Sequence, residues 1–217
     1  MKGKSSAKRL RFLIASGPTE EPIDPVRFIS NNSTGIMGQR LFQAAKLKGH
    51  AVTWIRCPEK ARTAIELQTK MAALLPKNDV VIMAAAVCDV RPKHFSGNKI
   101  KKGNLRAISL VKNPDILVSL KKKKKEGQVF IGFGIESARI FENGFKKVIL
   151  KGLDLIVLQK FTKNSNPFGE KPIQAYLLDR GKKRRHFWAI SKNRLSKILV
   201  SEAEKLYRAK LGFQSQK

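Results

Sequence analysis

The stretch VVIMAAAVCDVRP, residues 80–92, carries the clearest fold signal in the chain. Residues 80–84 are almost entirely apolar, which is typical of a strand that is covered on both faces of a parallel sheet. The small residues Ala84 to Ala86 follow at the strand end, where open α/β sheets bind their ligands. Outward from this stretch, β-branched runs alternate with helical patterns. That alternation predicts parallel strands joined by crossover helices.

The same periodicity places the other elements. We expect further parallel strands at residues 11–15, 51–56, 129–133 and 153–157. Helices are expected over 35–47, 63–75, from 113–115 into the lysine run 121–125, over 137–151 and from residue 192. Residues 174–178 and 185–189 flank the turn 179–181 and predict a β-hairpin. Residues 16–25, rich in Gly, Pro and Thr, are expected to form a loop, and residues 89–112, with Pro and Gly among lysines, a flap or loop.

Length and composition bound the class of protein. The 217 residues predict one domain over 1–217, with a basic tail at 1–9 and a C-terminal tail at 210–217. No apolar run approaches the ~20 residues that a membrane span requires. We therefore expect a soluble protein with no membrane partner. Cys57 and Cys88 are the only cysteines and have no metal-ligand spacing, so a reducing, cytoplasmic location is expected.

The net charge of +29 raises nucleic acid or an anionic membrane as partners. However, the basic residues are spread along the whole chain, without interleaved aromatic residues that would stack bases. A hydrated surface therefore explains the charge better, and we expect no specific nucleic-acid partner.

Four segments could hold an anionic ligand, and each has a plainer structural reading. Asn31 to Gly38 could bind phosphate at a helix start or simply cap the helix. Residues 84–92 could admit a ligand, with Asp89 as an acceptor or a magnesium-facing oxygen, or could be a tight helix–sheet contact. The lysines of KIKK, 99–102, could neutralise a triphosphate or be solvated charge, and Lys147 and Lys151 could share an anion or lie on one helix face by chance.

The ordered set of these segments resembles the phosphopantothenate-cysteine ligase family. The resemblance covers EPIDPVRFISNNSTGIMG, AAAVCDVRP, KIKK, NPDIL, IGFGIES, the lysines of the next helix, and KGLDLIV, over roughly residues 10–160. It implies a Rossmann-like, doubly wound, mostly parallel α/β sheet with helices on both faces and a C-terminal hairpin extension, in a homodimeric enzyme.

The resemblance also implies the reaction. The carboxylate of 4′-phosphopantothenate attacks the α-phosphate of CTP, with Mg2+ carried by the triphosphate, and the amine of L-cysteine then displaces the nucleotide. A separate flavin-dependent decarboxylase is the further partner that this pathway implies.

Residue roles follow from the same resemblance, residue by residue. Lys99 matches the flap lysine of nucleotidylate formation, and Asn31 matches the residue that converts the acyl nucleotidylate. Nucleotide contacts fall on Ala85, Asp89, Asn113, Pro114, Asp115, Ile116, Phe133, Lys147 and Lys151. Contacts to the acid substrate and the dimer partner fall on Ser33, Gly35, Met37 and Ala86.

The chain departs from the family pattern in several places. Pro18 stiffens a turn where many relatives have glycine, FGIES replaces FAAET, and Gln159 replaces an asparagine, which leaves the choice of nucleotide open.

Two other classes of protein stay in view. A short-chain oxidoreductase would need a glycine fingerprint and a Tyr/Lys pair, yet only Tyr176 and Tyr207 exist; a nucleic-acid-binding protein would bind with a steep salt dependence and without turnover.

Overall fold

A seven-stranded sheet forms the centre of the computed structural model, which describes residues 8–161 and 166–214. Its strand order is β11-β10-β9-β8-β5-β1-β4. The bounds are β1 Arg11–Pro18, β4 Ala51–Arg56, β5 Val80–Ala86, β8 Val129–Glu136, β9 Leu155–Lys160, β10 Ile173–Asp179 and β11 Arg184–Ile190. The five strands from β4 to β9 run parallel, and β10 and β11 add an antiparallel hairpin. The predicted Rossmann-like α/β fold with its C-terminal hairpin is confirmed.

Helices cover both faces of the sheet. Successive strand residues point to opposite sides, so each face presents its own row of apolar side chains that a helix layer buries. On one face α1 (Ile36–Leu47) and α5 (Lys192–Gln214) pack against alternate residues such as Phe12 and Ile82. On the other face α2 (Ala64–Leu74), α3 (Ile116–Lys121) and α4 (Ile140–Lys151) pack against the residues in between, such as Leu13 and Val81. Burial of both faces explains the unbroken apolar run of β5.

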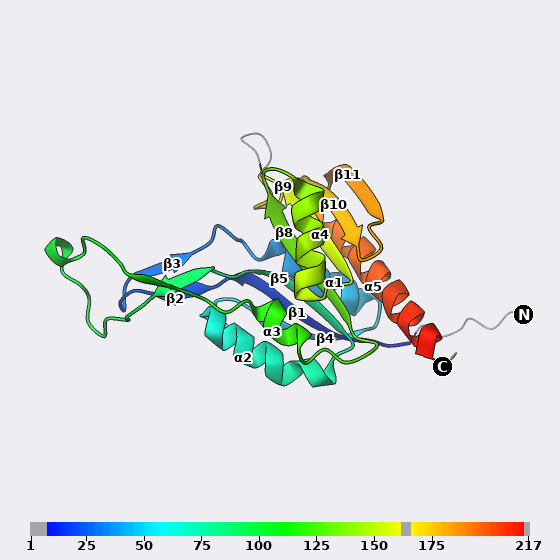
Figure 1. Cartoon of the computed structure of the whole chain (residues 1–217), viewed down its shortest axis with the longest axis horizontal. Helices are drawn as coiled ribbons and strands as arrows, with labels where there is room; N and C mark the ends of the chain where they lie inside the picture. The colour runs from blue at the N-terminus through cyan, green and yellow to red at the C-terminus, as the bar shows by residue number, and fades with distance from the viewer. Residues whose placement is uncertain (1–7, 162–165, 215–217) are drawn as a thin grey trace, which may run out of the picture.

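A long arm projects from the body of the molecule (Figure 1). It consists of the antiparallel pairs β2 (Glu20–Pro22) with β3 (Phe28–Ser30), and β6 (Val90–Pro92) with β7 (Leu110–Lys112), together with the loop 93–109. A 3-10 turn, η2 (Lys102–Asn104), lies within that loop. The prediction of a plain loop at residues 16–25 is wrong, because β1 continues to Pro18 and the β2–β3 hairpin follows. The flap expected at residues 89–112 is present, but its two ends, β6 and β7, pair as antiparallel strands.

Several boundaries differ from the prediction. The helix expected from residue 137 begins at Ile140, because β8 continues to Glu136 in register with Lys160 of β9. The last parallel strand, expected at 153–157, is Leu155–Lys160, because its pairing with β8 extends as far as Glu136 and Lys160. After α2, η1 (Leu75–Lys77) accommodates Pro76. Residues 210–214, expected as a tail, continue α5; residues 1–7 and 215–217 lie outside the described part of the chain.

Candidate functional site

A cavity of about 620 Å3 opens at the carboxyl edge of the parallel strands. Its floor is the end of β5 and β8, and its walls come from the segment before α1, from α3 and from α4. In the sheet, β1 lies between β4 and β5, so the chain reverses its winding direction beside this edge. Ligands of doubly wound sheets bind at that position.

The cavity brings together every candidate site residue except Lys99. The lining contains Asn31, Ser33, Gly35, Met37, Ala85, Ala86, Asp89, Asn113, Pro114, Asp115, Ile116, Phe133, Lys147 and Lys151. These residues come from segments up to 120 positions apart in sequence. The residues assigned to the nucleotide and those assigned to the acid substrate therefore line one cavity. Their individual roles remain predictions.

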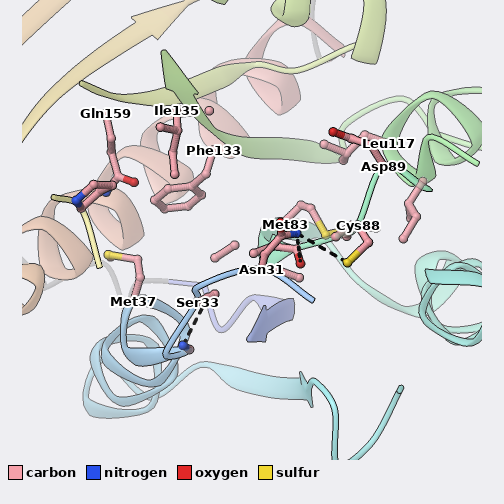
Figure 2. A pocket seen from close by; sticks show the side chains of 18 of the residues that line it. Asn31, Ser33, Met37, Met83, Cys88, Asp89, Leu117, Phe133, Ile135 and Gln159 are labelled. Atoms are coloured by element: carbon pink, nitrogen blue, oxygen red, sulfur yellow. Dashed lines mark hydrogen bonds between the residues drawn. The ribbon is translucent and has the colours of Figure 1, made fainter. Parts of the chain in front are cut away.

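Asn31 lies over the end of β5. Its Nδ2 atom donates a hydrogen bond to the carbonyl oxygen of Ala86 at 3.1 Å and lies 3.8 Å from Sγ of Cys88. Figure 2 shows this amide beside the Met83 and Cys88 side chains, with Met37 and Ser33 on the side of α1. The thiol of Cys88 is buried, and burial raises its pKa while a hydrogen bond with Thr19 opposes that rise. A thiol that stays protonated is a poor nucleophile, so the Asn31 amide is the group that this wall offers to a ligand.

The start of α1 presents backbone amides to the cavity. Gly35 precedes the helix with φ of 70°, in the left-handed region that favours glycine, and no side chain caps its first turn. Oγ of Ser33 accepts a hydrogen bond from the Gly35 amide at 3.4 Å. Unsatisfied amides at the positive end of a helix attract anions.

The opposite wall contributes two cations that already have acidic partners. Nζ of Lys147 lies 2.5 Å from Oε1 of Glu136, and Nζ of Lys151 lies 3.0 Å from Oδ2 of Asp115. Asp115 also caps α3 through the Val118 amide. These pairs fix both ammonium groups at the wall, where a polyanion can add to or replace the carboxylate partners.

Asn113 is held in place by its neighbours. Its Nδ2 donates to the Cys88 carbonyl at 2.9 Å, and its Oδ1 accepts from Arg91 at 3.1 Å. The amide therefore links the β6–β7 base of the arm to the end of β5. Asp89 lies beside it, exposed at the cavity mouth (Figure 2).

Lys99 does not line the cavity. It is exposed in the loop 93–109 of the arm, next to Ile100. The amide of Ile100 donates to Oδ2 of Asp24 at 3.1 Å, and its carbonyl accepts from Arg27 at 2.9 Å. The structure thus anchors the neighbour of Lys99 to the turn between β2 and β3.

The sequence analysis missed part of the lining. Gln159, noted only as a departure from the family pattern, is 7% exposed and lines the cavity together with Pro167, Phe168 and Lys192. These residues lie on β9, in the loop after it and at the start of α5. Gln159 and the two loop residues lie at and after the last parallel strand, where the sequence analysis named no site, whereas Lys192 follows the antiparallel hairpin, which a search of loops after parallel strands does not reach.

Across residues 8–161 and 166–214, no three His, Cys, Asp or Glu side chains gather closely enough to hold a metal ion. Within those ranges, every helix is too short or too polar to cross a bilayer.

Comparison with known proteins gives one consistent family. Residues 7–207 match the family described as DNA/pantothenate metabolism flavoprotein C-terminal domain. The chain is 35% identical over 191 residues to the coenzyme A biosynthesis bifunctional protein CoaBC of Borreliella burgdorferi, covering 82% of this chain and 48% of that protein. It is 36% identical over 164 residues to CoaBC of Escherichia coli K12, covering 69% of this chain and 40% of that protein. The chain spans about half the length of the curated relatives it matches.

Solved structures agree with the sequence comparison. The crystal structure of the C-terminal domain of coenzyme A biosynthesis bifunctional protein CoaBC superposes with a TM-score of 0.76 at 25% identity, covering 94% of this chain and all of that one. The DNA/pantothenate metabolism flavoprotein from Streptococcus pneumoniae gives a TM-score of 0.75 at 20% identity, covering 90% of this chain and 99% of that one, which supports the fold alone.

Proposed function

The chain belongs to the family of DNA/pantothenate metabolism flavoprotein C-terminal domains, and from this membership we propose that it is a phosphopantothenate-cysteine ligase of coenzyme A biosynthesis. The observation that carries the proposal is the single cavity that holds both residue sets. Residues assigned to the nucleotide and residues assigned to the acid substrate line the same cavity at the ends of β5 and β8. A ligase that activates a carboxylate needs its two substrates in contact.

The proposed reaction proceeds in two steps. A carboxylate oxygen of 4′-phosphopantothenate attacks the α-phosphorus of CTP, and the bond to the bridging oxygen breaks to release pyrophosphate. The amine of L-cysteine then attacks the activated carbonyl carbon, the amide forms, and CMP leaves. Each step builds negative charge on oxygen, which nearby cations and amide donors stabilise.

The wall residues suit these steps. Lys147 and Lys151 are placed to bind nucleotide phosphate, while the Asn31 amide can donate to the acyl nucleotidylate. Mg2+ would enter with the triphosphate, and the Asp89 carboxylate at the cavity mouth offers it an oxygen. Gln159 and Ile135 line the same space, so the preference for CTP over ATP or UTP depends on contacts that the family pattern does not supply.

The alternative enzyme class finds no support in the cavity. Neither tyrosine lines it: Tyr176 stacks on His186 in the hairpin, with ring centroids 4.2 Å apart, and Tyr207 is 9% exposed in α5. The Tyr/Lys pair of a short-chain oxidoreductase is therefore not formed at this site.

A homodimer is part of the proposal, and the arm supports it. The arm exposes large apolar side chains that the body leaves uncovered, namely Val26, Phe28, Phe95, Ile108 and Leu110. Apolar residues concentrated on a projecting element are typical of a protein–protein contact. For Lys99 to act, the loop 93–109 must move toward its own cavity, or it must serve the cavity of the partner copy.

The remaining parts of the proposal concern the whole chain. We propose that residues 1–217 form one ligase domain and that a flavin-dependent decarboxylase performs the following step. The cytoplasmic location stays a prediction.

A pyrophosphate-release assay tests the function. The purified chain is incubated with 4′-phosphopantothenate, Mg2+ and each nucleoside triphosphate in turn, with and without L-cysteine. We expect pyrophosphate release that requires the acid substrate, and amide formation only with cysteine. Absence of release with every nucleoside triphosphate would contradict the ligase proposal.

The Lys99→Gln variant tests the flap lysine within the same assay. Loss of a cation that stabilises developing phosphate charge typically costs about 100-fold or more in kcat, so release should fall with and without cysteine. Lys93→Gln removes an equal charge from the base of the same loop and should retain the parent rate. If Lys99→Gln turns over like Lys93→Gln, Lys99 has no role in nucleotidylate formation.

A further inference from the structure

Lys192 is a buried cation on the cavity wall. It is the first residue of α5 and is 4% exposed. Its Nζ atom donates a hydrogen bond to the carbonyl oxygen of Gly169, in the loop that also contributes Pro167 and Phe168 to the lining. Among residues 8–161 and 166–214, no carboxylate forms an ion pair with this ammonium group.

Burying such a charge is costly without an anion close by. Burial lowers the pKa of Lys192, and the charge of Glu170 only partly offsets the effect, since that carboxylate pairs with Arg40 at 3.0 Å. The position adds to the cost, because a cation at the first residue of a helix faces the positive end of the helix dipole. Fold stability alone does not favour lysine here.

The other two lysines of the cavity show the contrast. Lys147 pairs with Glu136 and Lys151 with Asp115, so each charge is compensated within the protein. Lys192 alone of the three leaves its end of the cavity with an uncompensated positive charge. The start of α1, whose first turn has no side-chain cap, contributes Met37 to the same lining.

We propose that Lys192 forms an anion subsite at this end of the cavity and binds a phosphate group of one of the two phosphorylated substrates. The subsite consists of Lys192, the Gln159 side chain and the start of α1 at Met37, and Figure 2 shows Gln159 and Met37 on the side of the cavity away from Asp89 and Leu117. A phosphate monoester or a polyphosphate satisfies the same chemistry. The subsite rests on the proposed ligase function for the identity of its ligand.

Lys192→Gln, Lys192→Arg and the control Lys197→Gln test the subsite. Lys197 lies on the same helix, is exposed and lies outside the cavity lining, so its variant changes the net charge equally. KM and kcat are measured for 4′-phosphopantothenate and for CTP, and unphosphorylated pantothenate is tried as the acid substrate. Thermal unfolding confirms that each variant is folded.

We expect Lys192→Gln to raise the KM of one substrate at least tenfold and to leave the KM of the other within twofold. If the acid supplies the phosphate, the variant also loses its preference for 4′-phosphopantothenate over pantothenate. If the nucleotide supplies it, only the KM of CTP rises. Lys192→Arg should recover part of the loss in either case, and Lys197→Gln should behave like the parent.

Unchanged KM values for both substrates in folded Lys192→Gln would overturn the proposal. So would an equal loss for both substrates that Lys192→Arg does not relieve, because that pattern belongs to a displaced loop at Gly169. Calorimetric titration with inorganic pyrophosphate separates this proposal from the ligase function. If the parent shows no turnover but binds pyrophosphate, and Lys192→Arg binds it more tightly than Lys192→Gln, the subsite stands while the ligase proposal fails.

Discussion

Asn31 illustrates how one side chain combines a structural contact with an available donor. Its Nδ2 atom already bonds to the Ala86 carbonyl, which fixes the amide over the end of β5. An amide has two N–H donors, and the second contacts only the Cys88 thiol at 3.8 Å, a weak acceptor that a ligand oxygen can replace. A carboxylate at this position would have none, and it would lie against a carbonyl oxygen.

The Asn31→Asp variant should therefore separate the two half-reactions. We expect pyrophosphate release to continue while amide formation falls about 100-fold, the usual cost of losing a donor to a developing oxyanion. Rapid quench with labelled acid substrate should show the acyl nucleotidylate accumulating. Asn32→Asp, which adds the same charge at the neighbouring position, serves as the control; equal losses in both variants would contradict a specific role for Asn31.

At the level of elements, α1 lies exceptionally close to β1. A Cβ atom at Gly38 would come within 2.0 Å of Cβ and 2.3 Å of Oγ of Ser16, and Ser16 is also held by the indole of Trp54 at 2.8 Å. Ser16 cannot move its Cβ atom without moving the strand. The close approach therefore positions the start of α1 at the cavity.

Gly38→Ala should push α1 away from the sheet. We expect the free energy of unfolding to fall by ~1–3 kcal/mol, as overpacking usually costs, and the KM values of both phosphorylated substrates to rise. Gly212→Ala in α5 is the matched control, since nothing lies within 4 Å of its Cβ position and alanine gains about 0.5–1 kcal/mol over glycine in a helix. Chemical denaturation measures both changes; equal stabilisation of the two variants would show that α1 has room to move.

The arm depends on a second contact between elements. Asp24 is 1% exposed and accepts hydrogen bonds from the amides of Val26, Arg27 and Ile100. The last of these ties the loop 93–109 to the β2–β3 turn.

Asp24→Ala should free that loop without unfolding the sheet. We expect faster tryptic cleavage at Lys99, Lys101, Lys102 and Arg106, because an untethered loop opens more often. Glu20→Ala on the same hairpin is the control, since Glu20 pairs with Arg62 and does not contact the loop. Mass spectrometry of the early fragments gives the rates, and equal cleavage in the two variants would contradict the tether.

For the whole molecule, carboxylates that are buried or partly buried join segments far apart in the chain. Oδ1 of Asp79, before β5, pairs with Arg11 of β1 at 2.7 Å, and Oε2 of Glu204 in α5 pairs with Lys48 after α1 at 2.7 Å. Burial alone would raise both pKa values. Hydrogen bonds from Arg11 to Asp79, and from Lys48 and His50 to Glu204, outweigh burial and hold both pKa values below the ordinary range.

These shifts set the pH dependence of stability. Because both carboxyl groups have lowered pKa values in the folded state, the unfolded chain binds more protons in acid. The stabilisation is complete above about pH 5 and is lost as the pH falls through the folded-state pKa values. Denaturation from pH 3 to pH 7 should show this rise, and Asp79→Asn should flatten it; an identical slope in the variant would contradict the contribution of Asp79.

The sequence alone determined the fold class and most of the site. Unbroken apolar runs and the helical periods between them reflect burial of each strand on both faces, which is a local property of the chain. Ordered motifs placed Asn31 and Asp89 in loops that follow parallel strands, and Asn113 at the start of the next helix, and such loops meet at one edge of a parallel sheet. The cavity residues among them could therefore be found before any coordinates.

Only the tertiary structure decided the rest. The arm depends on pairing between strands of three residues, too short to leave a periodic pattern, and on the Asp24 contact across 76 positions. Lys192 looks like one of 45 basic residues in the sequence. Its burial, and the absence of a carboxylate partner among the described residues, arise from packing of α5 against the loop after β9, and long-range packing of that kind is not encoded in any local stretch of the chain.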